Sequence, residues 1–344
     1  MGRFGEITGL LVLVLILSGC TGTGEIPRKT VMAVPLVWPD PPEPARIVYV
    51  SSFSDAEDLG ISEGPFSALA RILFGEKQLR LVRPMAIVVS MDKIYVADPG
   101  AKGVHRFDKS KNEHHLIIRD DNQPLPSPVG LALGNGGEVY VTDSVLGQVF
   151  LIQPDSNIAI PVPLVLQLKQ PTGIAFDSER NELFVVDTAA HQVNIFNQDG
   201  KLLRQFGQRG DTDGAFNFPT FIWRTPDGAI YVVDALNFRI QVFDRTGKWQ
   251  SKFGRHGDGS GDLARHKGIA TDSHGHVYIV DALFHAFQIF DPKGNFLLSV
   301  GELGQAPGEF WLPSGIYIDK TDSIYVADSY NQRVQIFQFV GQST

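Results

Sequence analysis

The chain has 344 residues, of which 43% are hydrophobic and 20% are charged, and its formal net charge at pH 7 is -8. This composition is too apolar and too weakly charged for a disordered chain, and the acidic balance excludes a protein that gains affinity by neutralising nucleic-acid phosphates. The single cysteine excludes an internal disulfide and a metal site built from several cysteines. The length allows either two ordinary domains or one closed all-β unit.

The first twenty residues predict a lipid anchor. An unbroken apolar run at residues 10–17 is too short to span about 30 Å of hydrocarbon, so it predicts the core of a signal peptide. The run leads into Leu-Ser-Gly-Cys, which resembles the lipobox of bacterial lipoproteins and ends at the only cysteine, Cys20. The resemblance implies that residues 1–19 are removed and that Cys20 is acylated. The alternative is an ordinary secretory signal followed by a buried cysteine.

Lipid on Cys20 would hold the mature chain on a membrane. The next residue is Thr21, and in Gram-negative lipoproteins a residue other than Asp at this place implies the outer membrane. We therefore expect a protein of the cell envelope, anchored on the periplasmic side of the outer membrane.

Three short segments follow the cysteine. Residues 20–45 contain six prolines without sustained periodicity, which predicts a stiff, extended tether. Residues 46–53 have the pattern of an isolated strand. In the insertion at residues 54–83, Pro65 precedes apolar residues at helical spacing, which predicts a short amphipathic helix near residues 64–74. Packing against the rest of the chain and docking of a partner both remain open for this helix.

The strongest signal is a unit that recurs six times within residues 84–344. Each unit carries an aromatic residue, two small or aliphatic residues and an aspartate, and the aspartates are separated by 45, 44, 47, 47 and 47 residues. Alternation with period two, interrupted by Asp-Gly turns, indicates about four short antiparallel strands in each unit. The aspartates are Asp98, Asp143, Asp187, Asp234, Asp281 and Asp328. Repetition at this period predicts an all-β, six-bladed β-propeller.

The last unit ends after its third strand, near Phe339, and would leave an open sheet edge. We expect residues 46–53 to supply the missing fourth strand and so to close the ring. The unit also resembles the NHL repeat, in a pattern that units four and six carry most fully. In unit four the matching residues are Gly207, Gly210, Gly214, Phe216, Pro219, Asp234, Asn237 and Arg239. The resemblance implies a propeller of NHL type.

One face of such a propeller collects the connections into the first strand and from the second to the third strand of each blade. The residues expected to ring the central channel on that face are Met85, Val129, Thr172, Thr220, Lys267 and Ser314. The six aspartates lie on the same face. They either close their own loops by accepting backbone hydrogen bonds or attract calcium or a cationic partner, and their presence in every unit favours the first role.

Residues that break the repeat are candidates for binding. Four positions after the aspartates, the side chains change chemistry from blade to blade. Blade four has Trp223 and Arg224 in its first strand, and we interpret them, with His266 and Lys267 of blade five, as a basic and aromatic sector. In the alternative, Trp223 fills the channel and Arg224 pairs with a carboxylate. The predicted binding face is Thr172, His191, Thr220, Trp223, Arg224, Phe238, His266, Lys267, His285 and Ser314.

Two functions fit these observations. The first is a membrane-anchored binding or scaffold propeller that holds a protein or glycan partner on this face. The alternative is a metal-dependent enzyme similar to the amidating lyases or lactonases, since NHL-type lyases place zinc-binding histidines on such strands. The matching ring positions here hold no histidine. We therefore expect no catalytic residues, no metal, no cofactor and no nucleic-acid partner, and the residues favour the binding role.

Overall fold

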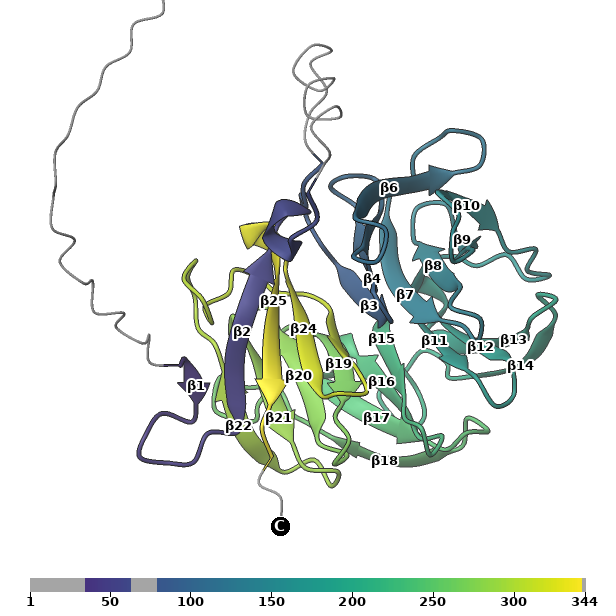
Figure 1. Cartoon of the computed structure of the whole chain (residues 1–344). Coiled ribbons are helices and arrows are strands. Elements are labelled where there is room, and N and C mark those ends of the chain that lie inside the picture. Colours follow the sequence, from purple (N-terminus) through teal and green to yellow (C-terminus); the bar gives the residue numbers. More distant parts are fainter. Residues whose placement is uncertain (1–34, 63–78, 342–344) are drawn as a thin grey trace, which may run out of the picture. The chain divides into compact units, whose positions relative to one another are not determined.

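The computed structural model describes residues 35–62 and 79–341. Almost all of the regular structure is β-strand, and Figure 1 shows the strands gathered into blades around a common centre. The helical segments in these ranges are short 3-10 turns, namely η1 (Glu57–Leu59), η2 (Thr188–Ala190), η3 (Ala235–Asn237) and η4 (Ser329–Asn331). In the part of the chain that the structure describes, no helix has the length and apolarity to cross a membrane. The signal peptide and Cys20 lie outside the described residues.

Each blade has four antiparallel strands, which in blades one to five run in chain order from the channel outward. The first strands are β3 (Ala86–Ser90), β7 (Pro128–Leu133), β11 (Pro171–Asp177), β15 (Pro219–Arg224), β19 (His266–Thr271) and β23 (Ile316–Ile318). The second strands are β4 (Lys93–Asp98), β8 (Val139–Asp143), β12 (Glu182–Asp187), β16 (Ile230–Asp234), β20 (Val277–Asp281) and β24 (Ser323–Asp328). Each second strand ends at the aspartate of its unit.

The third strands are β5 (Gly103–Asp108), β9 (Gln148–Ile152), β13 (Gln192–Asn197), β17 (Arg239–Phe243), β21 (Ala286–Phe290) and β25 (Arg333–Phe339). The outermost strands are β6 (Glu113–Arg119), β10 (Ile158–Pro161), β14 (Leu202–Phe206), β18 (Trp249–Phe253), β22 (Phe296–Val300) and β2 (Ile47–Phe53). Blades one and two are joined at their edges, because β6 pairs with β10 in parallel. The fold is therefore the predicted all-β, six-bladed propeller.

The N-terminal strand closes the ring as predicted. β2 pairs antiparallel with β25 and completes the sheet of blade six, so the first and last described segments share one blade. Ile47 and Phe53, at the two ends of β2, are 0% and 1% exposed. The first strands contact one another around the full circle, including β23 with β3.

The predicted tether at residues 20–45 is too long at its C-terminal end. β1 (Val37–Trp38) pairs with β2, and the Trp38 ring packs edge-on against Phe337 at a centroid distance of 5.7 Å. Residues 35–45 therefore belong to the packed unit and not to an extended spacer. Prolines favoured the spacer interpretation, but Trp38 supplies an apolar ring large enough to hold the segment on blade six.

The predicted insertion is described only at its ends. Ile61 and Leu81 are buried against Phe53 and Phe107, between the edge of blade six and blade one. An isolated bridge joins Asp55 and Arg80, so the two ends of the insertion meet. The predicted helix at residues 64–74 lies outside the described residues.

Glycines let the first strands approach one another around the channel. A Cβ atom on Gly315 would lie 2.3 Å from the Met85 carbonyl oxygen of the next blade, and one on Gly173 would lie 2.7 Å from the Thr220 carbonyl oxygen. Because the atoms in the way are backbone, no side-chain rotation relieves the clash. The backbones of these neighbouring blades are therefore in close contact at this level.

Candidate functional site

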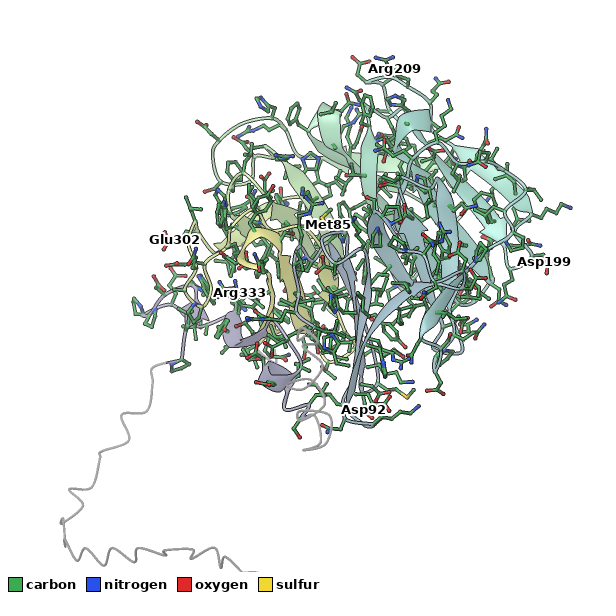
Figure 2. The ribbon with its side chains drawn as sticks, turned by 90° about the horizontal axis from the view of Figure 1, so that it is seen from above. Met85, Asp92, Asp199, Arg209, Glu302 and Arg333 are labelled. Atoms are coloured by element: carbon green, nitrogen blue, oxygen red, sulfur yellow. The ribbon has the colours of Figure 1, made fainter. Side chains whose placement is uncertain are left out.

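The two ends of the channel differ, and each end is named here by its connections. The register pairs Pro219 with Asp234 and His266 with Asp281, so the aspartates lie where the first strands begin. We call this end the loop face. The opposite end, where hairpin turns join first and second strands, is the turn face. Figure 2 shows Met85 near the middle of the view, whereas Asp199, Arg209 and Glu302 lie toward its margin.

The six aspartates are structural, as the sequence favoured. All six are buried, and each accepts hydrogen bonds from the backbone of the segment that leads into its own first strand. Asp98, for example, accepts from the backbone N–H groups of Val82 and Arg83 at 2.7 and 2.9 Å. Burial raises the pKa of Asp328, but three donors (the Trp311 N–H and the side chains of Asn331 and Arg333) oppose that rise.

Asn237 and Arg239 brace the same loop in blade four. The Asn237 amide and the Arg239 Nε donate to one oxygen of Asp234 at 2.8 and 2.7 Å. The Arg239 guanidinium also donates to the carbonyl oxygens of Thr212 and Ala215 in the glycine-rich loop that precedes the blade. Blade six repeats the arrangement at the equivalent residues. These polar side chains are therefore already engaged in hydrogen bonds that hold the loops.

Two of the predicted channel hydroxyls face neighbouring blades. Thr172 is buried, and its hydroxyl donates to the Thr220 carbonyl oxygen of the next blade at 2.7 Å. Ser314 is fully buried, and its hydroxyl lies 3.4 Å from the Met85 sulfur across the closure of the ring. Thr220 lacks such a contact, because its buried hydroxyl has no hydrogen-bond partner in the described part of the chain.

Lys267 gives the loop face a positive centre. Its pKa is lowered to about 8, first because burial disfavours the charged amine and then because Arg265 and Arg83 carry the same charge nearby. The pKa still leaves the amine mostly protonated at pH 7. Within residues 35–62 and 79–341, none of the three cations forms a salt bridge. Arg83 and Arg265 are exposed.

The predicted loop-tip residues also hold the blades together. His191, Phe238 and His285 all adopt left-handed backbone, with φ of 55, 53 and 52°. The Nδ1 atoms of His191 and His285 accept the backbone N–H groups of Phe218 and Leu312, each at 3.1 Å, in the blade that follows. The Phe238 ring packs on His256 of the next glycine-rich loop, with centroids 4.2 Å apart.

The predicted basic and aromatic sector is divided between the two faces. Trp223 lies near the far end of β15, where its indole Nε1 donates to Thr271, the last residue of β19, at 2.9 Å. Arg224 is directed to the same end, and its Nε lies 2.9 Å from an oxygen of Asp177. Lys267 is the second residue of β19 and lies at the loop face. Trp223 and Arg224 therefore belong to the channel near the turn face, which is the alternative that the sequence left open.

His266 is not an accessible ligand. It is 2% exposed, and both ring nitrogens lack a hydrogen-bond partner in the described ranges. Burial lowers its pKa. The imidazole stands at the position where the other five blades carry a proline, and it fills that space as a neutral ring.

The sequence-based selection missed a set of apolar side chains on the loop face. They occupy equivalent loop positions in several blades, and each is more than one-third exposed. The set, here called the apolar rim, comprises Val82, Val145, Phe218, Leu236, Leu283, Trp311 and Tyr330. Trp311 and Tyr330 contact each other at a centroid distance of 5.6 Å. The signal was present in the sequence, because the second position after the aspartates is Val, Leu, Leu and Tyr in four blades.

Among the described residues, no group of three or more His, Cys, Asp or Glu side chains is arranged to hold a metal ion. The nearest approach to a histidine cluster is in blade one, where the His105 Nδ1 lies 3.0 Å from the His114 Nε2. Burial lowers the pKa of His105 to about 4 and that of His114 to about 3. The pair is therefore neutral at physiological pH.

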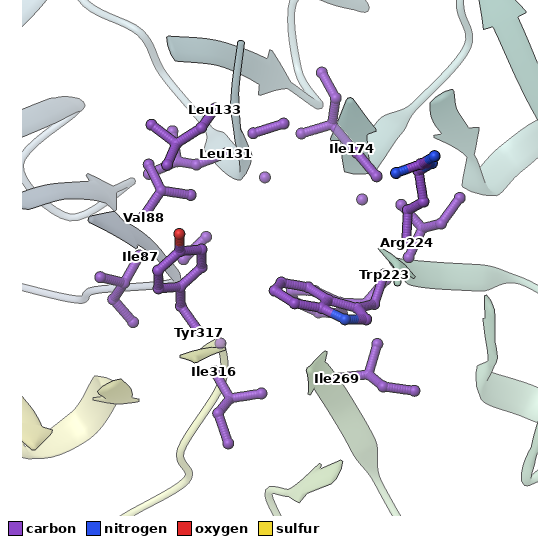
Figure 3. A pocket seen from close by; sticks show the side chains of 18 of the residues that line it. Ile87, Val88, Leu131, Leu133, Ile174, Trp223, Arg224, Ile269, Ile316 and Tyr317 are labelled. Atoms are coloured by element: carbon purple, nitrogen blue, oxygen red, sulfur yellow. The ribbon is translucent and has the colours of Figure 1, made fainter. Parts of the chain in front are cut away.

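The channel holds a cavity of about 180 Å³ that extends from the level of Gly173 and Gly315 toward the turn face. Its walls are the first strands of the blades, with Trp223, Tyr317, Leu131, Ile174 and Arg224 among the lining residues (Figure 3). The predicted ring residues Thr172, Thr220, Lys267 and Ser314 are not part of this lining. The loop face and the cavity are thus two separate candidate sites.

Comparisons with known proteins agree with the fold. A model of the NHL repeat matches residues 310–337, and a model described as a 6-bladed beta-propeller matches residues 224–288. No curated protein has a sequence that matches this chain.

Three solved structures illustrate the range of similar folds. A protein of unknown function from Bacteroides thetaiotaomicron has a TM-score of 0.62 and 16% identity, over 85% of this chain and 75% of its own. An auxiliary nutrient binding protein from the same organism has a TM-score of 0.60 and 12% identity, over 75% and 69%. Virginiamycin B lyase from Staphylococcus aureus has a TM-score of 0.55 and 16% identity, over 76% and 98%. At these identities the likeness concerns the fold alone.

Proposed function

We propose that this chain is a binding protein of the bacterial cell envelope, anchored by lipid on Cys20, whose loop face holds a protein partner. The apolar rim is the observation that carries the proposal. Most polar groups on this face are already used by the fold, whereas the rim leaves Leu236 and Leu283 each 53% exposed and Tyr330 49% exposed. Exposed apolar and aromatic side chains gathered on one face are typical of protein-binding surfaces.

The cations of the loop face narrow the chemistry of the partner. Lys267, Arg83 and Arg265 lie near one another on this face, in a chain whose formal net charge is -8. A partner with an apolar contact surface around an acidic group complements this arrangement, because the acidic group would replace the water that now solvates the three cations. A protein surface fits better than a glycan, since the rim offers branched aliphatic side chains as well as aromatic rings.

The binding role is compatible with the structural neighbours, one of which is named as a nutrient binding protein. The lipobox-like sequence supports the location. Removal of residues 1–19 and acylation of Cys20 would place the propeller on the periplasmic side of the outer membrane, where a tether from residue 20 to residue 34 would separate it from the lipid surface.

The proposed face is tested by site-specific photo-cross-linking in intact cells. A photoreactive residue at Leu236 or Leu283 is expected to give an adduct of one discrete mass, because both positions would lie in the interface. The matched controls are Leu203 and Leu297, which are 43% and 50% exposed on the outermost strands β14 and β22. Adducts of equal yield at the control positions, or no discrete adduct at the rim, would contradict the proposal.

The proposed anchor is tested separately by Cys20→Ser. The wild-type chain is expected in the membrane fraction, whereas the variant is expected to lose this association, because the serine hydroxyl cannot take the lipid that the cysteine sulfur carries. The measurement is the distribution of the protein between membrane and soluble fractions, with metabolic labelling by a fatty acid. Labelling of the variant at the wild-type level would disprove acylation at Cys20.

A further inference from the structure

We propose that the central cavity is a second binding site, distinct from the loop face, for a small uncharged molecule with an apolar body and one hydrogen-bond acceptor such as a carbonyl oxygen. The cavity volume of about 180 Å³ exceeds the roughly 150 Å³ of an apolar protein cavity that holds benzene. One substituted aromatic ring therefore fits. The inference goes beyond the proposed function, because it concerns the other end of the channel.

The cavity exists because the side chains that line the channel at one level differ in size from blade to blade. Four positions after the proline that introduces each of these blades, blades four and six carry Trp223 and Tyr317, whereas blades two and three carry Ala132 and Ala175. The two aromatic rings meet edge-on at 6.0 Å on one side, and the alanines leave the opposite side unfilled. Figure 3 shows Trp223 and Tyr317 next to this space, with Ile174 and Leu131 across it.

The polar groups of the wall explain why an acceptor is needed. The Trp223 indole N–H is used by Thr271, and the Tyr317 hydroxyl donates to the Val89 carbonyl oxygen at 3.3 Å. Arg224 is different, because its side chain is 8% exposed and its Nε and Nη2 have no hydrogen-bond partner in the described part of the chain. Buried donors are rarely left without a partner, so this guanidinium points to a missing acceptor.

The charge around Arg224 selects an uncharged ligand. The Arg224 Nε lies 2.9 Å from an oxygen of buried Asp177, a contact that balances the charges but does not have the geometry of a hydrogen bond. A second carboxylate, that of Glu179, lies 3.9 Å from Nη2 and 3.7 Å from the Arg245 Nη1, so two cations and two carboxylates balance here. An anionic ligand would add a negative charge that no further cation among the described residues compensates. A neutral carbonyl oxygen can accept from Nη2 without that repulsion.

The ligand would enter from the turn face. A second hollow, of about 780 Å³, is lined by turn residues that include Met91 and Asp319, and it shares Leu133 and Tyr317 with the cavity. Toward the loop face the cavity reaches Gly315 and Gly173, where the first strands of neighbouring blades approach closely, but not Thr172 or Ser314 just before them. A ligand in the cavity would therefore leave the apolar rim free to bind a protein at the same time.

The test compares two probes of similar shape, acetophenone and ethylbenzene, of which only the first has a carbonyl acceptor. The mature chain is titrated with each probe, and the Trp223 indole N–H resonance is followed by NMR. We expect one site, saturation by both probes, and binding of acetophenone about tenfold tighter, because a hydrogen bond to a charged donor favours it. Absence of any shift at Trp223 up to millimolar probe, or equal affinity of the two probes, would overturn the proposal.

Two variants locate the site. Ala175→Leu fills the cavity without removing a polar group and is expected to abolish binding of both probes, whereas the surface control Leu297→Ser is expected to leave binding unchanged. Arg224→Met is expected to bind ethylbenzene as the wild type does and to lose the preference for acetophenone. Should this variant fail to fold because Asp177 loses its partner, the proposal is still tested by the Ala175→Leu result and by the ratio of the acetophenone and ethylbenzene affinities in the wild type. Wild-type binding in Ala175→Leu would place the probes elsewhere and disprove the site.

Discussion

A chain that starts at residue 54, and so lacks β1 and β2, is expected to lose its cooperative folded state. β2 supplies the outermost strand of blade six, so its removal exposes the whole edge of β25 and uncovers the Phe337 ring, which Trp38 and Tyr49 now flank at 5.7 and 5.6 Å. Loss of the buried side chains of Ile47 and Phe53 alone costs about 3–6 kcal/mol. That sum approaches the whole stability of many domains, about 5–15 kcal/mol.

The measurement is thermal unfolding followed by circular dichroism, and the matched control is a chain that starts at residue 35 and so keeps both β1 and β2. The control is expected to melt in one sharp transition, whereas the chain that starts at residue 54 is expected to show none. A milder variant, Phe53→Ala, is expected to lower the free energy of unfolding by about 3–5 kcal/mol. If the two truncated chains melt alike, β2 does not close the ring.

Stability is expected to fall steeply as the pH drops from 6.5 toward 4, because of the buried histidine pair in blade one. In the folded chain the pKa of His105 is about 4 and that of His114 about 3, mainly because both rings are buried. In the unfolded chain both would titrate near 6.5. Below pH 6.5 the unfolded chain therefore binds more protons than the folded chain, and each pH unit costs about 1.4 kcal/mol for each histidine.

Charged groups near the two histidines do not reverse the lowering of their pKa values. The buried carboxylate of Asp98 lies 3.7 Å from the His105 Nε2, but burial dominates and the His105 pKa is still low. His115 carries a like charge when protonated and lowers the pKa of His114 further. From pH 6.5 to pH 4.5, His105 alone is expected to remove about 3 kcal/mol from the free energy of unfolding.

The test is urea unfolding at pH 7, 6, 5 and 4.5 for the wild type and for the double variant His105→Leu, His114→Phe. The double variant is expected to show a much flatter dependence over this range, since neither replacement binds a proton. His274→Gln, at an exposed position of blade five, serves as the control and is expected to keep the wild-type slope. An unchanged slope in the double variant would show that other groups cause the acid sensitivity.

The sequence was sufficient for the fold because the blade is a local unit. Each blade is a four-strand meander of about 46 residues, so turn residues, period-two alternation and the aspartate all lie within one short window. The same reasoning found the closing strand, since a blade with three strands leaves an edge that some other segment must cover. It failed at residues 35–45, where a single ring, Trp38, outweighs the prolines around it.

The candidate site was predicted less well than the fold, because the type of a residue does not show at which level of the channel its side chain lies. Lys267 is the second residue of its first strand and Trp223 is the fifth of its own, so about 10 Å of strand separates the two levels. Side chains that seemed to share a sector therefore lie at opposite ends of the channel. The apolar rim was missed for another reason, since Leu236 and Leu283 resemble core residues until their exposure is known.

By itself, the sequence determined the repeat, the number of blades and the strand that completes the ring, and it favoured the structural role of the aspartates. These features depend on patterns within one repeat or on the absence of a strand from one repeat. Only the tertiary structure decided which polar groups already make hydrogen bonds within the fold, which apolar side chains remain exposed, and that Arg224, paired with Asp177 without a hydrogen bond, lies beside a cavity. Those properties arise when six blades pack together, because burial and hydrogen bonding between blades depend on side chains roughly 46 residues or more apart in the chain.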